Sequence, residues 1–233
     1  MISYKHSCAP TVVSDRIFRP TDTGNLIAEW GDPSGVNTPS DSIIDQHSAL
    51  RALIARDRTH HLTASDAIQA RTYRVAAYQG LGSSESVEDT AQDLRWFAEQ
   101  ADSIHPTHAV LFAFFDDPTI SDQRDFEHQL WSQLIGMHNI DTRNRGWAPS
   151  VKCDPDDEDL SFSIAGQAFD IIGLHPHADE PSRRFEIPTL IFTPQVTAIS
   201  DGLRTRIRTT HRAPATTTSE RHSNHAAPSF AHI

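Results

Sequence analysis

Residues 171–192, IIGLHPHADEPSRRFEIPTLIF, place two histidines, two carboxylates and two adjacent arginines between apolar runs that read as strands. Pro176 disfavours the helical region for the residue before it, so we expect an extended backbone at His175. If that conformation continues, His175 and His177 project to the same side. Two imidazoles on one face can bind one metal ion, and Asp179 or Glu180 could add an oxygen ligand. One hypothesis is therefore a non-haem metal site.

The same stretch also contains the groups that a haem requires. Haem iron needs an axial donor, and the two propionates need cationic partners. His175 offers the donor, and Arg183 and Arg184 offer the cations, although neighbouring residues on an extended segment face opposite sides and only one arginine should reach the pocket. A third interpretation is a solvated loop in which the arginines form weak surface ion pairs with Asp179 and Glu180. The residue types alone leave all three open.

Composition restricts the partners and the compartment. The 233 residues suffice for one domain with a sizeable core. With 31 acidic and 20 basic residues the formal net charge is −11, which predicts repulsion from nucleic acid and from anionic membrane surfaces. We see neither a long apolar run nor a secretory signal in residues 1–30, and Cys8 and Cys153 form no paired motif. These features predict a cytoplasmic protein.

The spacing of apolar residues predicts an α+β fold, a mostly antiparallel sheet with helices packed against it. Helices are expected over residues 42–57, 86–100 and 121–138, with Ser86 as the cap of the second. Strands are expected over residues 72–81, 108–115 and 188–192, and a hairpin over residues 160–174.

Three segments follow from this pattern. Residues 1–41 mix Pro, Thr, Asp, Gly and Ser and are expected to be an irregular N-terminal extension. Residues 42–192 form the expected α+β domain. Residues 193–233 have almost no large aliphatic side chains, so we expect a disordered tail that cannot offset its chain entropy by burial.

Several motifs resemble one known family. The stretch DEDLSFSIAGQAFDIIGLHPHADEPSRRFEIPTLIF is similar to the YqcI/YcgG-type family, whose members carry G-L-H-P and then R-R-F at this separation. RTYRVAAYQGLGSSESVEDTAQDLRWFAEQ resembles the family's strand, Leu-Gly-Ser turn and helix, and FEHQLWSQLIGMHNID resembles its next helix. The resemblance covers about residues 45–192.

The resemblance implies a function. The family includes haem-dependent enzymes that N-hydroxylate the guanidine of arginine or of an arginine-like amino acid, in D-cycloserine and guanitoxin biosynthesis. It implies haem b as cofactor, activation of O₂ or peroxide at the iron, an arginine-like small molecule as substrate and an electron donor as a further partner. His175 is then the expected axial ligand, and Arg183 and Arg184 are expected to bind the propionates or shape the pocket.

Three other histidines are alternative iron ligands. His177 belongs to the same loop. His138 ends a helix, and Asp141 three residues later could orient its ring, although a histidine at a helix C-terminus is also favoured by the helix dipole alone. His61 lies in THHLTA, where members of the family carry a cysteine in a segment like F-P-C-V-G-A; a histidine there lacks the electron donation of a thiolate.

The chain also departs from the family pattern. Glu180 stands where the family has its first arginine, and His177 stands where the family has a small or polar residue. After residue 192 the chain reads FTPQVTAISDGLR, unlike the family's continuation, so we expect the last family elements to be absent. These departures support a second hypothesis, a catalytically inactive homologue that binds haem or another ligand. A non-haem metal enzyme using His175, His177 and Glu180 is the third.

Overall fold

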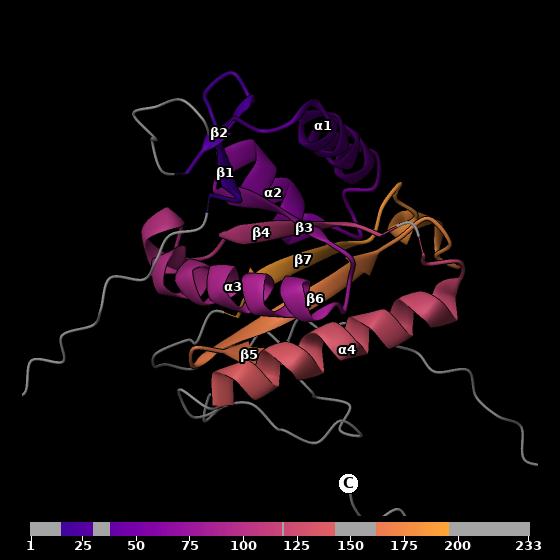
Figure 1. Ribbon diagram of the computed structural model, residues 1–233. Coiled ribbons are helices and arrows are strands. Elements are labelled where there is room, and N and C mark those ends of the chain that lie inside the picture. The colour runs from indigo at the N-terminus through magenta and orange to yellow at the C-terminus, as the bar shows by residue number, and fades with distance from the viewer. Residues whose placement is uncertain (1–14, 30–37, 118, 143–161, 196–233) are drawn as a thin grey trace, which may run out of the picture. The chain divides into compact units, whose positions relative to one another are not determined.

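The computed structural model describes residues 15–29, 38–117, 119–142 and 162–195 (Figure 1). They form one sheet with helices on both faces, which confirms the α+β class. The strands are β1 (Ile17–Pro20), β2 (Leu26–Ala28), β3 (Tyr73–Gln79), β4 (Val110–Asp116), β5 (Phe162–Ile164), β6 (Gln167–Leu174) and β7 (Thr189–Pro194). The helices are α1 (Asp41–Arg56), α2 (Leu62–Ala70), α3 (Ser84–Ile104) and α4 (Gln123–Thr142), with a short 3₁₀ helix η1 (Pro181–Arg183).

The order of the strands brings the carboxyl ends of β3, β4 and β6 to the same edge of the sheet. The seven strands follow the order β2-β1-β3-β4-β7-β6-β5, and only the β3–β4 pair is parallel. Because β4 and β6 both pair antiparallel with β7, they run in the same direction as each other and as β3. The loop that follows β6 therefore leaves from the edge where β3 and β4 also end.

The central strand β4 shows why its sequence is apolar without a break. Leu111 and Phe115 pack with α3 and α4 on one face of the sheet, whereas Phe112 and Phe114 pack with α1 and α2 on the other. All four side chains are buried. A strand covered on both faces has no solvent side, so its side chains are hydrophobic in both directions. Figure 1 shows the two helical layers on opposite sides of the sheet.

A buried glutamine joins α3 to α4. The cap of α3 is Ser83, and the prediction of Ser86 as the cap is wrong by one turn. The Ser86 hydroxyl instead donates to the side-chain oxygen of Gln133, which also accepts from the Gly82 amide, each at 2.9 Å. The amide nitrogen of Gln133 donates to the Ser86 carbonyl at 3.1 Å. A single side chain thus satisfies three polar groups of the turn that begins α3.

The two ends of the predicted domain differ from the structure. Residues 17–28 were expected to be irregular, but β1 pairs with β2 and with β3 and so belongs to the main sheet. At the other end β7 continues to Pro194, two residues into the segment predicted to be disordered. The prediction of disorder from residue 196 onwards lies outside the described residues.

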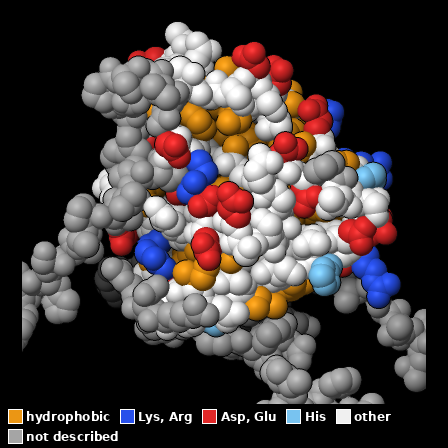
Figure 2. Space-filling model, in the orientation of Figure 1, with side chains coloured by type: hydrophobic (Ala, Val, Ile, Leu, Met, Phe, Trp, Pro, Cys, Tyr) orange, Lys and Arg blue, Asp and Glu red, His pale blue; other side chains and the backbone are white. Residues whose placement is uncertain are grey.

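Acidic side chains are spread over the face that carries α3 and α4, as Figure 2 shows. Two large apolar side chains of α4, Trp131 and Ile135, are also exposed, at 46% and 56%. Within the described ranges, none of the helices has the length and hydropathy that a membrane span needs.

Replacing Gln133 by glutamate tests its connecting role. The carboxylate of Gln133→Glu has no N–H to offer the Ser86 carbonyl, and it places a charge in a fully buried position. We expect a loss of about 1–3 kcal/mol in the free energy of unfolding, measured by urea titration. Gln69→Glu, at an exposed position of α2, is the matched control and should change the stability little. Equal stabilities of the two variants would contradict this role.

Candidate functional site

The polar loop after β6 folds back on itself immediately after His175. The His175 N–H donates to the Arg183 carbonyl at 3.1 Å, and the Phe185 N–H donates to the His175 carbonyl at 3.2 Å. The chain turns at once, since the Ala178 N–H reaches the same carbonyl at 3.4 Å. His175 is buried, whereas His177 is exposed. The expectation that the two histidines share one side is therefore wrong, because the extended conformation ends at His175.

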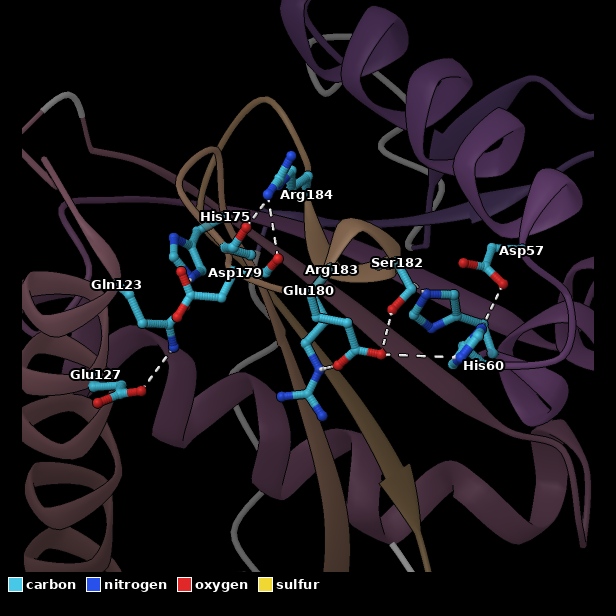
Figure 3. A network of polar contacts seen from close by, with 12 residues as sticks. Asp57, His60, Gln123, Glu127, His175, Asp179, Glu180, Ser182, Arg183 and Arg184 are labelled. Atoms are coloured by element: carbon cyan, nitrogen blue, oxygen red, sulfur yellow. Dashed lines mark hydrogen bonds and ion pairs between the residues drawn. The ribbon is translucent and has the colours of Figure 1, made fainter. Parts of the chain in front are cut away.

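The ring of His175 is held by α4. Its Nε2 lies 2.9 Å from the side-chain oxygen of Gln123 (Figure 3). The ring of Phe126 stacks on it with centroids 4.1 Å apart and planes 12° apart. Burial lowers the pKa of His175, and the nearby His177 acts in the same direction, against the opposing effects of Glu127 and others. Burial therefore favours the uncharged form of the ring. Its Nδ1 is buried and has no hydrogen-bond partner in the described part of the chain.

Gly173 leaves the space that this stacking needs. A Cβ added at Gly173 would lie 2.7 Å from Cζ of Phe126 and 2.8 Å from its Cε1. Real Cβ atoms essentially never come this close to another heavy atom, so any other residue would push the Phe126 ring aside. The glycine of the G-L-H-P motif thus serves the packing of Phe126 against the histidine two residues further on.

Both arginines of the loop are engaged within it. Arg184 is exposed, and its Nε and Nη2 donate to the carbonyls of Ala178 and Asp179 at 2.7 and 3.2 Å. Arg183 is half-exposed, and its Nε lies 3.2 Å from a carboxylate oxygen of Glu180. Arg184 therefore fixes the shape of the turn, whereas Arg183 takes part in an ion pair at the surface.

Glu180 connects the loop to the turn between α1 and α2. It accepts from the Ser182 hydroxyl at 2.7 Å and lies 4.0 Å from Nε2 of His60 (Figure 3). His60 is also bonded to Asp57 at 2.6 Å, and this hydrogen bond raises the pKa of His60. Glu180, which departs from the family pattern, has a local role here. Sequence reasoning missed His60, although the adjacent pair of histidines in THHLTA was a signal.

His61 is the second buried histidine beside this loop. It is 2% exposed, the same as His175. Its Nε2 lies 2.9 Å from the Ser182 carbonyl, and its Nδ1 is buried with no hydrogen-bond partner among the described residues. The Nδ1 atoms of His61 and His175 are thus two buried nitrogens that could bind a metal or a cofactor.

The remaining candidates lie apart. Within the described residues no group of three His, Cys, Asp or Glu side chains could hold a metal ion, so the set of His175, His177 and Glu180 is not formed. His138 lies 15 positions beyond Gln123 on α4, about 22 Å along the helix axis, and cannot share a site with His175. Asp141, expected to orient His138, accepts from the Ala165 N–H at 3.0 Å and from Arg95 at 3.4 Å.

A further buried histidine, His47 of α1, was not predicted to be of interest. Its Nε2 lies 2.8 Å from the Tyr73 hydroxyl, in the core between α1 and the sheet. Burial, with a smaller effect of Arg51, lowers the pKa of His47 to about 4. The helical pattern showed that this face of α1 is buried, but the partner lies 26 residues further along the chain.

A protein-family model described as the YqcI/YcgG family matches residues 51–224, which is most of the chain. The chain belongs to the YqcI/YcgG family. No curated protein and no solved structure matches it. The match includes the whole loop from His175 to Phe185 and His61. It also extends past residue 192, where we expected the family elements to end, so part of the predicted tail belongs to the YqcI/YcgG domain.

The fit of Phe126 beneath β6 can be tested by overpacking. Gly173→Ala should lower the free energy of unfolding by about 1–3 kcal/mol, because the new methyl group meets the Phe126 ring. Adding Phe126→Leu removes the ring and should make the alanine less costly than it is in the wild-type background. Urea titrations of the two single variants and the double variant measure this coupling. Strictly additive costs would show that the two residues are not in contact.

The buried His47 predicts a pH dependence of stability. Its pKa is about 4 in the folded chain and near 6.5 when unfolded, so the unfolded chain binds the proton more readily. The stability that His47 contributes is present above pH 6.5 and is lost as the pH falls from 6.5 through 4. In His47→Gln, which keeps a polar partner for Tyr73, the urea midpoint should fall less over this range. Parallel pH curves for both proteins would contradict the assignment.

Proposed function

We propose that this chain binds haem b through His175 and N-hydroxylates the guanidine of arginine or of an arginine-like amino acid. One observation carries the proposal: in the G-L-H-P to R-R-F loop His175 is buried, and its Nδ1 has no hydrogen-bond partner in the described structure. A buried acceptor without a partner costs about 1–3 kcal/mol, which a ligand on that atom would recover. The neutral ring suits a metal ion, because only the uncharged imidazole has a free lone pair.

The other residues of the loop have roles that follow from their contacts. When bound, haem would supply the activation of O₂ or peroxide. Arg183 is the cation proposed for a propionate, because its ion pair with Glu180 is half-exposed and such pairs contribute only about 0–1 kcal/mol. Arg184 is proposed to hold the turn through the carbonyls of Ala178 and Asp179. If Arg183 left Glu180 and paired with a propionate instead, the loss of the Glu180 ion pair would cost little free energy.

The substrate class agrees with the charges near His175. A guanidinium is a planar cation that carboxylates bind in pairs of hydrogen bonds. Glu127 and Asp179 are close enough to His175 to act on its charge state, and both are exposed. We propose these two carboxylates as partners of the guanidinium. With peroxide, one oxygen atom enters an N–H bond and the other leaves as water; with O₂, an electron donor must supply two electrons.

A second candidate is a homologue that binds haem or another ligand without turnover. The observation that favours it is the ion pair between Glu180 and Arg183. Position 180 is where the resemblance implies an arginine, and here it holds a carboxylate. This contact lowers the positive charge available to the propionates. Product formation separates the two candidates, since only an enzyme converts arginine, with peroxide or a reductant, into a product with one added oxygen atom, detected by mass spectrometry.

Reconstitution with hemin tests the proposed ligand. We expect the purified chain to give a Soret band that is lost in His175→Ala. His177→Ala, which changes an exposed histidine of the same loop, is the matched control and should keep the band. A band that survives His175→Ala but disappears in His61→Ala or His138→Ala would assign the iron to another histidine. The absence of any band in the wild-type chain would contradict haem binding altogether.

A further inference from the structure

The hydrogen bonds around Gln123 determine which nitrogen of His175 carries the proton. The amide nitrogen of Gln123 lies 2.7 Å from a carboxylate oxygen of Glu127, and its amide oxygen lies 2.9 Å from Nε2 of His175. The ionised carboxylate can only accept, so the NH₂ group of Gln123 must face Glu127. The amide oxygen that remains can also only accept. Nε2 of His175 must therefore carry a hydrogen to donate to it, and in the tautomer with a single ring hydrogen the lone pair is on Nδ1.

Local structure holds Gln123 in place. It is the first residue of α4, and the turn that begins this helix is tied by Asp122, whose side chain accepts from the Asp125 N–H at 2.8 Å. The Ser121 hydroxyl also donates to the carboxylate of Asp125. One helical turn after Gln123, Phe126 stacks on His175 and Glu127 orients the amide. The first turn of α4 thus contacts the His175 ring twice, at Nε2 through Gln123 and on its flat face through Phe126.

We propose that Gln123, oriented by Glu127, is a positioning residue that fixes His175 as the Nε2–H tautomer and so makes Nδ1 the nitrogen that binds the iron. The identity of the bound group rests on the proposed function, whereas the tautomer does not. Histidines that bind metals usually donate their other N–H to a carboxylate or carbonyl oxygen, which fixes the ring and raises its basicity. Gln123 supplies such an acceptor from an element 52 residues away in sequence.

The tautomer can be measured without haem. In the full-length chain labelled with ¹⁵N, the two nitrogens of a neutral imidazole differ in chemical shift and in their couplings to the ring protons. Signals of His175 are identified by their absence in His175→Gln. We expect the protonated nitrogen to be Nε2 at pH 7.5. A predominant Nδ1–H tautomer in the wild-type chain would overturn the proposal without the need for any variant.

Gln123→Met tests the positioning role itself. Methionine has a similar length but lacks the amide oxygen, so we expect the two tautomers to become mixed and hemin to bind about 10–100-fold more weakly. Gln69→Met, at an exposed glutamine of α2, is the matched control and should leave both measurements unchanged. Circular dichroism confirms that both variants fold. An unchanged tautomer in folded Gln123→Met would exclude Gln123 as its cause.

The two proposals fail in different ways. If the wild-type chain shows the Nε2–H tautomer but no Soret band with hemin, the haem proposal is wrong and the role of Gln123 stands. If hemin binds but the tautomer is Nδ1–H, the role of Gln123 is wrong and haem binding stands.

Discussion

Two backbone hydrogen bonds of His175 close the loop on which the rest of the site depends. Through its N–H and its carbonyl, His175 binds Arg183 and Phe185, so the loop of residues 176–184 begins and ends beside His175. The closure returns Phe185 to the core, where its ring stacks with Phe114 of β4 at 6.3 Å. It also places the Ser182 carbonyl against His61. The residue proposed to bind the cofactor is therefore also the structural anchor of its loop.

Buried histidines connect this fold to its proposed chemistry. His47, His61 and His175 are each at most 3% exposed, and each uses its Nε2 in a hydrogen bond within the protein. Buried polar atoms in folded proteins nearly always have partners. His61 and His175 each retain a buried Nδ1 without one in the described structure. His61 follows the turn that Glu180 contacts through His60, and it bonds to Ser182, so both of these Nδ1 atoms belong to histidines that contact the same loop.

Sequence patterns predicted the elements well where their period was long and continuous. The unbroken apolar run of β4 indicated a buried strand, and the helical spacing of apolar residues in α3 and α4 indicated helices. The hairpin of β1 and β2 escaped notice because strands of four and three residues are too short to show alternation. The α+β domain was recognised, but its N-terminal edge was not.

Within the site, the sequence predicted the backbone conformation of neighbouring residues but not the contacts between residues that are distant in sequence. Pro176 correctly indicated an extended His175, yet the turn that separates His177 from it depends on hydrogen bonds to Arg183 and Phe185, which no local rule describes. Gln123 was one polar residue among several at the start of a helix. Its contact with His175 spans 52 residues and depends on the strand order that brings the start of α4 to the end of β6.

The central claim is that the end of β6 presents Nδ1 of His175 to a haem iron. A crystal structure of the chain reconstituted with hemin tests it most directly. We expect iron bonded to Nδ1 of His175, with Nε2 of the same ring still hydrogen-bonded to Gln123. Iron bonded to His61 or to any other residue, with His175 bound only to Gln123, would contradict it.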